Sequence, residues 1–234
     1  MVQALAEVRT LTFDMFGTVL DLSGSIVPAL REFFDKSGSD ADPDRFWAEW
    51  RARQRLEQHQ DTILMLGHRG YLDSVGRALR HTLRRQGLPT EGTAVLELLR
   101  TFDQLRAFDD AQEGLVRLAR KFRLVALSNG DTGLVQHLVA TSVDARFDRC
   151  ISVDRVGRFK PHPSVYRMAA AELGCEPGEI LMVAAHAFDI LGARACGYLG
   201  AYVNRYGLPY EESHLLPDLE VRDFRELADC LMTG

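Results

Sequence analysis

Short, unbroken apolar runs alternate with helical patterns along most of this chain, and the alternation limits the folds open to it. Four such runs lie at residues 8–13, 123–127, 180–184 and 199–203. Strands covered on both faces of a parallel sheet show such runs, whereas half-exposed strands alternate. We therefore predict an α/β fold whose core is a doubly wound, Rossmann-like parallel sheet. The helical patterns between and after the runs lie at 111–121, 132–141, 163–173, 187–196 and 223–232.

One long stretch, residues 20–103, interrupts the alternation and contains no convincing strand. Its clearest helical patterns cover residues 44–60 and 63–86. We expect a core domain made of residues 1–19 and 104–234, with residues 20–103 inserted as a helical cap subdomain. The insertion would lie over the carboxyl ends of the strands, where open α/β sheets form their ligand sites.

Composition and charge limit which partners the protein is expected to bind and in which cellular compartment it is expected to work. The 234 residues carry a formal net charge of −5, so we expect no broad basic surface and no nucleic-acid partner. The four cysteines are widely spaced without a CxxC pair, which predicts reduced, buried thiols and no zinc site. No stretch reaches the length of a membrane span, and the first residues lack the apolar run of a signal peptide. We expect a cytoplasmic protein with no membrane partner.

Four polar segments fall at or just after strand ends. They are residues 14–18, 127–130, 160–163 and 183–189. Taken singly, each has a simpler explanation as a turn or a helix cap. In a doubly wound sheet, however, such ends converge on one crevice. Their common placement therefore favours a shared site.

Asp14, at the end of the first predicted strand, is the candidate nucleophile of that site. The residue two positions further on is Phe16. An acid at that position could protonate a departing alcohol, and phenylalanine cannot. The leaving group must therefore be one that departs well as an anion.

These segments closely resemble the motifs of the haloacid dehalogenase superfamily of aspartate-nucleophile hydrolases, over nearly the whole chain. The resemblance implies a nucleophile at Asp14, a hydroxyl residue at Ser128, a lysine at Lys160 and an acid at Asp189. The helical insertion matches the family's cap. Because most members are phosphatases, the superfamily resemblance alone would favour phosphoryl transfer.

Two phosphatase motifs are incomplete in this chain. Phosphatases of the family carry a general acid at the position of Phe16 and a magnesium-binding Asp at the position of Ala185. A dianionic phosphate monoester needs a cation to approach an aspartate nucleophile. With Asp189 as the one acid left in its segment, we expect no metal site and no other cofactor.

The L-2-haloacid dehalogenase branch of the superfamily resembles the chain better, motif by motif. That branch has Phe-Asp-x-Tyr-Gly-Thr-Leu, and residues 13–19 read Phe-Asp-Met-Phe-Gly-Thr-Val. Its Leu-Ser-Asn-Gly appears unchanged at 127–130, and its Lys-Pro-x-x-x-x-Tyr matches Lys160 and Tyr166. Its cap motif, Trp-Arg-x-x-Gln-Leu-Glu, is close to residues 50–57, which have one extra residue, and this likeness matches Arg51 to the halide-binding arginine. The alternative for Arg51 is one charge on a solvated helix face.

This resemblance implies hydrolysis of a short 2-haloalkanoic acid in two steps. In the first step Asp14 would attack C2 of the substrate, form an ester and release halide. Arg51 and Asn129 would stabilise the departing anion. The substrate carboxylate would be held by Ser128 and by the backbone N–H groups of Met15 and Phe16.

In the second step water would attack the Asp14 ester, with Asp189 as the base. Thr18 and Lys160 would fix Asp14 and partly neutralise it, and Tyr166 would support the Lys160 region. The same resemblance suggests a homodimer formed through cap helices.

The last motif departs from the branch pattern. Well-matched members have Ser-Ser-Asn-Ala-Trp-Asp, and residues 184–189 read Ala-Ala-His-Ala-Phe-Asp. His186 could take over hydrogen bonding or general-base work, since the ordinary histidine pKa of about 6.5 lies near neutral pH. Alternatively, it only fills the space of the Asn beside Phe188. A bulkier His could also tighten the halide pocket and favour small halides, even fluoride.

Three other functions stay open at this point. One is a magnesium-dependent phosphatase of the same superfamily. Another is hydrolysis at a different activated carbon, such as a strained ring, through the same Asp14 ester. The third is a binding module that has lost the chemistry, which the intact set of Asp14, Ser128, Asn129, Lys160 and Asp189 speaks against.

Overall fold

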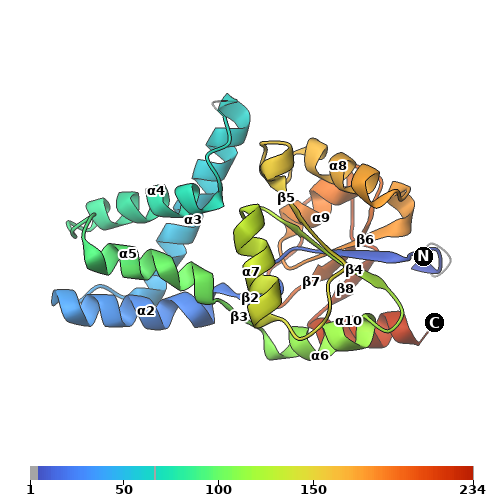
Figure 1. Ribbon diagram of the computed structural model, residues 1–234, viewed down its shortest axis with the longest axis horizontal. Helices are drawn as coiled ribbons and strands as arrows, with labels where there is room; N and C mark the ends of the chain where they lie inside the picture. Colours follow the sequence, from blue (N-terminus) through green and yellow to red (C-terminus); the bar gives the residue numbers. More distant parts are fainter. Residues whose placement is uncertain (1–4, 66, 234) are drawn as a thin grey trace.

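The computed structural model describes residues 5–65 and 67–233, and its centre is a six-stranded sheet (Figure 1). The strand order is β5-β4-β1-β6-β7-β8, and every neighbouring pair is parallel. The order extends from β1 in both directions, which confirms the predicted doubly wound sheet. The strands are β1 (Thr10–Phe13), β4 (Arg123–Ser128), β5 (Arg149–Ser152), β6 (Ile180–Ala184), β7 (Leu199–Val203) and β8 (Leu219–Val221).

Helices cover both faces of this sheet. Figure 1 shows α8 and α9 on one face and α6 and α10 on the other. Because β1, β6 and β7 are buried along their whole length, their apolar runs have neighbours on both sides. The helices around the sheet are α6 (Asp109–Leu118), α7 (Thr132–Ser142), α8 (Pro163–Leu173), α9 (Ala187–Arg194) and α10 (Phe224–Met232), with short 3-10 helices η2 (Val153–Arg155) and η3 (Pro177–Glu179).

The register of the central strands brings the polar segments to one edge. Phe13 of β1 lies opposite Ala126 of β4 and Val183 of β6. Asp14, one residue further on, lies beside the last residues of both neighbours, and its N–H donates to the Val183 carbonyl at 3.0 Å. Asp14 and Ser128, which ends β4, therefore reach the same edge of the sheet.

Four further helices form a group beside the sheet, on the side away from the chain termini (Figure 1). Two short strands, β2 (Leu20–Asp21) and β3 (Arg106–Ala107), pair antiparallel where the chain leaves the sheet and returns to it. That residues 20–103 act as a cap stays a prediction. The group, called the helical unit below, consists of α2 (Leu22–Ser37), α3 (Pro43–Leu64), α4 (Tyr71–Arg85) and α5 (Thr93–Arg100), followed by η1 (Thr101–Gln104).

Two sequence predictions in this stretch are wrong. The helix predicted over 63–86 begins only at Tyr71, because α3 continues to Leu64 and Met65 then adopts a left-handed φ of 53°. Gly70 follows with a φ of 98°, a conformation that glycine adopts without strain. The strand β2 lies where no strand is predicted, since two residues are too few to show an alternating pattern.

One set of hydrogen bonds that connects the helical unit to the sheet lies at the start of α4. Gly70 offers no side chain to cap this helix, and Asp131, from the loop after β4, caps it instead. The Asp131 carboxylate accepts the N–H of Tyr71 at 2.7 Å and that of Leu72 at 3.0 Å. A Cβ on Gly70 would lie 2.5 Å from Asp131 Oδ1, so this approach requires glycine. The cap fixes where α4 begins, and Tyr71 with it.

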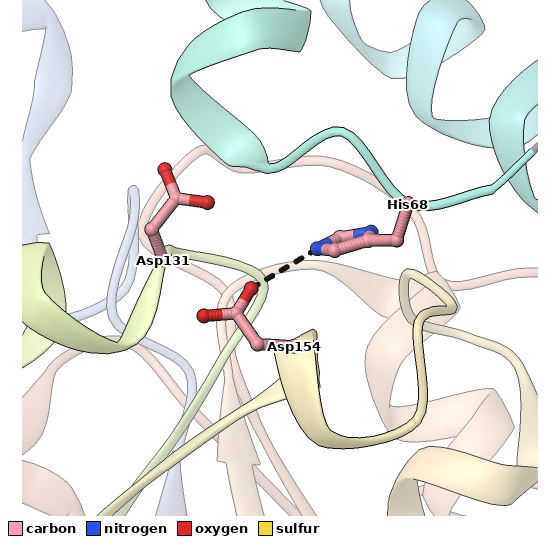
Figure 2. A group of neighbouring side chains, drawn as sticks. All are labelled: His68, Asp131 and Asp154. Carbon is pink, nitrogen blue, oxygen red and sulfur yellow. Dashed lines mark hydrogen bonds and ion pairs between the residues drawn. The ribbon is translucent and has the colours of Figure 1, made fainter.

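Asp131 belongs to a cluster with His68 and Asp154 (Figure 2). One ligand atom from each of the three lies within 4.8 Å of the others, a spacing that could hold a metal ion. His68 Nε2 contacts Asp154 Oδ1 at 3.1 Å, however, and Asp154 Oδ2 accepts the N–H of Thr132 at 2.7 Å. Because helix N-termini already engage both carboxylates, a cation would face two positive helix ends. We interpret the cluster as a second set of contacts that connects the helical unit to the sheet.

The described residues include no membrane-spanning helix and no disulfide bond. Within residues 5–65 and 67–233, no helix is long and apolar enough to cross a membrane. The four cysteines all lie in the described part of the chain and are free thiols, as predicted, but the prediction that they are buried is wrong, because Cys150, Cys175 and Cys196 are partly exposed and Cys230 is exposed. Burial raises the pKa of the Cys150 and Cys196 thiols, so both stay protonated at neutral pH.

Candidate active site

Asp14 lies at the carboxyl end of β1 and is 8 % exposed. Thr18 donates from Oγ1 to Asp14 Oδ2 at 2.7 Å, and the same hydroxyl accepts the N–H of Ala185 at 2.9 Å. The turn between them passes through Gly17, whose φ is 88°. A Cβ on Gly17 would lie 2.9 Å from His186 Cε1, so glycine lets the imidazole approach the turn. The Gly-Thr turn thus fixes one carboxylate oxygen and leaves room for a ring above it.

Lys160 joins Asp14 to a second buried carboxylate. Its Nζ lies 2.7 Å from Asp189 Oδ2 and 3.4 Å from Asp14 Oδ1. The hydroxyl of Tyr166 donates to Asp189 Oδ1 at 2.7 Å, so both Asp189 oxygens accept hydrogen bonds. All of these side chains except that of Asp14 are almost completely buried, and the ammonium has the paired environment that a buried charge requires. Asp14, Lys160, Tyr166 and Asp189 therefore form one network.

Burial and charge move the pKa values of the two carboxylates in opposite directions. Burial alone would raise the pKa of Asp14, but Lys160, His186 and Thr18 together hold it far below its ordinary value. Burial, with the negative charge of Asp14 adding to it, raises the pKa of Asp189 to about 6 against the opposing effect of Lys160. At neutral pH Asp14 is fully ionised, whereas Asp189 titrates close to the working range of a general base.

His186 lies against the same carboxylate. Its Nδ1 is 3.4 Å from Asp14 Oδ2, within ion-pair distance, but the two atoms are not aligned as a hydrogen bond. Among the described residues, Nδ1 has no hydrogen-bond partner. Burial lowers the pKa of His186 although Asp14 opposes the shift, so the ring is neutral at pH 7. A neutral ring with a free nitrogen beside Asp14 can orient a water molecule or a substrate atom.

The loop after β4 contributes Ser128 and Asn129. Ser128 is fully buried, and its Oγ accepts the N–H of Gly130 at 3.0 Å. Asn129 Oδ1 accepts the N–H of Lys160 at 2.8 Å, which leaves its amide NH₂ as a donor. A Cβ on Gly130 would lie 2.5 Å from Phe16 Cε2, so glycine allows the loop to pass against the Phe16 ring. These contacts hold the loop against Phe16 and Lys160.

A cavity of about 20 Å³ lies at Asp14. Such a volume is close to that of a single bound water molecule, so the site is tight. Three aromatic rings, those of Phe16, Tyr71 and Phe188, give it apolar walls, and arginine, amide and imidazole groups give it donors. The predicted residues that line it are Asp14, Phe16, Arg51, Asn129, His186 and Phe188.

The other predicted residues lie outside this lining. Met15 and Ser128 are buried at the strand ends, next to Phe16 and Asn129 in the chain. The remaining four do not line the cavity either: Thr18 and Lys160 contact Asp14 directly, Asp189 contacts Lys160, and Tyr166 donates to Asp189.

Sequence reasoning missed three residues that line the cavity. Arg55 lies one helical turn after Arg51 on α3, so the two arginines share a helix face. That spacing was a signal, but Arg53 obscured it because it belongs to the same arginine-rich run and pairs with Glu57 instead. Tyr71 gave no signal, because the sequence predicts the middle of a helix there. The three are Arg55, Gln58 and Tyr71.

The two arginines that line the cavity, Arg51 and Arg55, form no ion pair within the described chain. Arg77 on α4, by contrast, binds Glu57, Asp61 and Asp73. Arg51 Nη1 donates to the neutral Gln54 at 2.5 Å, and its guanidinium lies 5.7 Å from the centre of the Trp47 ring. Burial and the charge of Arg51 lower the pKa of Arg55. Two positive guanidinium groups face the single negative charge of Asp14, so this end of the cavity can accept an anion.

A wider cleft of about 480 Å³ opens beside the cavity. The two spaces share Arg51, Arg55, His186 and Phe188 in their linings. The cleft also reaches Tyr206, whose hydroxyl donates to the Gly17 carbonyl at 2.8 Å. It offers a route by which a small anion could pass the two arginines on its way to Asp14.

A doubly wound sheet with an aspartate after β1, a lysine on a loop and a second acid after β6 defines a class of α/β hydrolases with an inserted helical unit. The family model of haloacid dehalogenase-like hydrolases matches residues 8–197, and the chain belongs to this family. Within it, the chain belongs to the L-2-haloacid dehalogenase branch.

Three relatives show how far the similarity extends. Haloacetate dehalogenase H-2 of Moraxella sp. strain B is 30% identical over 219 residues, covering 93% of this chain and 95% of its own. The (S)-2-haloacid dehalogenase of Pseudomonas sp. strain YL is 31% identical over 229 residues, covering 97% and 96%. A crystal structure of a defluorinating L-2-haloacid dehalogenase superposes with a TM-score of 0.85 at 28% identity, covering 96% of this chain and 95% of its own.

Proposed function

We propose that this enzyme hydrolyses the carbon–halogen bond of short 2-haloalkanoic acids to 2-hydroxy acids and halide, through an ester of Asp14. The observation that carries the proposal is the cavity itself. It places an ionised carboxylate, held by Thr18 and Lys160, opposite two unpaired arginines and between apolar rings. A carboxylate nucleophile and an anion-accepting wall are what displacement of halide from carbon requires.

In the first step Asp14 attacks C2 of the substrate, and the electron pair of the carbon–halogen bond leaves with the halide. Asp14 Oδ2 is held by Thr18, whereas Oδ1 has only the longer contact with Lys160, so Oδ1 is the better placed attacking atom. The backbone N–H groups of Met15 and Phe16 make no hydrogen bond within the described chain and would bind the substrate carboxylate. Arg51, Arg55 and the Asn129 amide would receive the halide.

In the second step water attacks the carbonyl carbon of the ester, and Asp189 accepts its proton. Asp189 is held by Lys160 and Tyr166, and a pKa of about 6 lets it act as a base near neutral pH. His186 would hold the water through the free Nδ1 beside Asp14. Because Lys160 supplies positive charge to both carboxylates, we propose that neither step needs a metal ion.

We also propose that fluoroacetate is among the substrates. The cavity holds about 20 Å³, and the His186 ring narrows it at the position where well-matched members have Asn. The defluorinating L-2-haloacid dehalogenase whose structure resembles this one is consistent with that extension. Residues 20–103 would act as a cap that keeps bulk water from the ester.

A homodimer formed through the helical unit is part of the same proposal. Ile63, Leu64 and Met65, at the end of α3, expose 75%, 59% and 69% of their surface. Contiguous apolar surface of this kind is common at contacts between subunits. The mass of the particle in solution, measured by light scattering, tests the proposal, and a monomeric mass would refute it.

Halide release from a small panel tests the proposed reaction. Chloroacetate, both enantiomers of 2-chloropropionate, and fluoroacetate should be assayed beside a generic phosphate monoester, with and without EDTA. We expect chloride from chloroacetate and from the (S)-enantiomer, unaffected by EDTA. Phosphate release that EDTA abolishes, with no halide release, would replace the proposal with the magnesium-dependent phosphatase. Turnover of chloroacetate without turnover of fluoroacetate would remove only the extension to fluoride.

The pKa of Asp189 predicts the acid limb of the pH profile. Asp14 has no charge once it is an ester, so the pKa of Asp189 in that intermediate lies below the value of about 6 that it has beside ionised Asp14. A base acts only when ionised, so kcat should fall about tenfold per pH unit below that lowered pKa and be level from about pH 6 upward. Bromoacetate is the suitable substrate, because its good leaving group makes ester hydrolysis the slower step. His186→Asn should keep this limb in place. A limb that disappears in His186→Asn would transfer the role of base to the imidazole.

A further inference from the structure

Tyr71 carries a buried polar group that the mechanism above does not use. Its side chain is 2 % exposed, and its hydroxyl has no hydrogen-bond partner among the described residues. Buried tyrosine hydroxyls usually have a partner, because an unmet donor costs free energy. Tyr71 lines the cavity at Asp14. A ligand in that cavity is therefore the natural candidate for its partner.

The groups around this hydroxyl are donors too. Gln54 Nε2 is also buried without a partner within residues 5–65 and 67–233, and Gln54 Oε1 already accepts from Arg51. Burial raises the pKa of Tyr71, whereas the charge of Arg51 and the donor groups of Gln54 and Arg51 lower it. Arg51 and the Gln54 NH₂ can only donate, so the O–H proton of Tyr71 has no acceptor among the described residues. A hydroxyl and an amide NH₂ without acceptors of their own thus lie beside a guanidinium, an arrangement that suits an anion.

The position of Tyr71 is fixed before any ligand arrives. Its ring stacks on Phe16, with centroids 4.3 Å apart and planes at 15°. Its backbone N–H donates to Asp131 at 2.7 Å, and its carbonyl accepts from Ser74 Oγ at 2.6 Å. A donor held in place from three sides needs little reorganisation when charge develops beside it.

We infer that Tyr71 is a specificity-determining residue that donates its O–H hydrogen bond to the departing halide, beside Arg51. The inference rests on the proposed dehalogenation. As the bond from Asp14 to C2 forms, the carbon–halogen pair leaves with the halide, and Tyr71 keeps its proton throughout. A hydrogen bond stabilises fluoride more than chloride, and chloride more than bromide. Tyr71 therefore favours the smaller halides, independently of the space that His186 occupies.

Tyr71→Phe tests the inference, because it keeps the stack on Phe16 and removes only the hydroxyl. Halide release in a single turnover should be measured for fluoroacetate, chloroacetate and bromoacetate. All three give the same Asp14 ester, so the later hydrolysis cannot produce a dependence on halide. We expect a loss of about 10- to 100-fold for fluoroacetate, less for chloroacetate, and about threefold or less for bromoacetate. If the wild-type enzyme does not release fluoride from fluoroacetate, the inference is judged by whether Tyr71→Phe loses more rate with chloroacetate than with bromoacetate.

Tyr210→Phe is the matched control, because its hydroxyl donates to the Leu215 carbonyl at 3.1 Å and does not line the cavity. That variant should leave all three rates unchanged. Free chloride should also inhibit Tyr71→Phe less strongly than wild type. Equal losses for all halides, or no loss, would overturn the inference. A wild-type enzyme that releases no halide from any substrate would instead refute the proposed function.

Discussion

Asp14→Asn is expected to reduce halide release from every 2-haloacid by at least about a thousandfold. Asparagine nearly matches the shape of aspartate and can still accept from Thr18, so the turn should persist. It lacks the negative charge that Lys160 and Thr18 stabilise, and the neutral amide is a very poor nucleophile toward carbon. Lys160 keeps its shorter contact with Asp189, so the buried ammonium remains paired. Halide release by highly purified protein is the measurement, with the melting temperature as a check on folding.

Isotope labelling separates the ester route from direct attack by water. In a single turnover with excess enzyme in H₂¹⁸O, the ester route puts the heavy oxygen into the Asp14 carboxylate, because water attacks the ester carbonyl. Direct displacement by water would put it into the hydroxy acid and leave the peptide that contains Asp14 unlabelled. Asp14→Ala, which cannot revert by deamidation, should be as inactive as Asp14→Asn. Full activity in either variant, or an unlabelled peptide, would end the covalent scheme.

The sequence was sufficient to predict the four central strands of the sheet and the residues at their ends. Unbroken apolar runs have few alternatives in a chain of this length, and β6 and β7 end where the pattern predicts. Because the strands are parallel and in this register, Asp14 and Ser128 lie at the same edge of the sheet. The edge strands β5 and β8 were not predicted, because they include exposed positions and lack a long apolar run.

The helical side of the cavity was harder to predict, for a physical reason. Residues such as Arg55 and Tyr71 reach the site because the helical unit packs against the sheet. Such packing leaves no periodic pattern in the local sequence. Tyr71 depends on a helix start that Gly70 and Asp131 define together, 61 positions apart in the sequence. Arg55 depends on which face of α3 turns toward Asp14, and a helix with arginines at 51, 53 and 55 gives no single answer. The sequence predicted Asp189 as the base of the second step. Its raised pKa, however, follows from its complete burial in the folded chain.

Asp189→Asn is expected to separate the two half-reactions. Asp14 would still displace halide, because its own hydrogen bond to Thr18 and its contact with Lys160 are unchanged. Hydrolysis of the ester would lose its base, and steady-state turnover should fall by about a hundredfold or more. We therefore expect a burst of one halide per active site followed by near arrest. Mass spectrometry of the intact protein should show the ester accumulating, and digestion should place it on Asp14.

His186→Asn is the matched variant that decides whether the imidazole shares this role. It installs the residue that well-matched members of the branch have, and it removes the ring whose Nδ1 lies 3.4 Å from Asp14 Oδ2. If His186 only orients water, the amide can replace it, and turnover without accumulated ester should continue. An ester that accumulates in His186→Asn but not in Asp189→Asn would make the imidazole the base. Asp189, whose two oxygens already accept from Lys160 and Tyr166, would then serve only to hold Lys160 against Asp14.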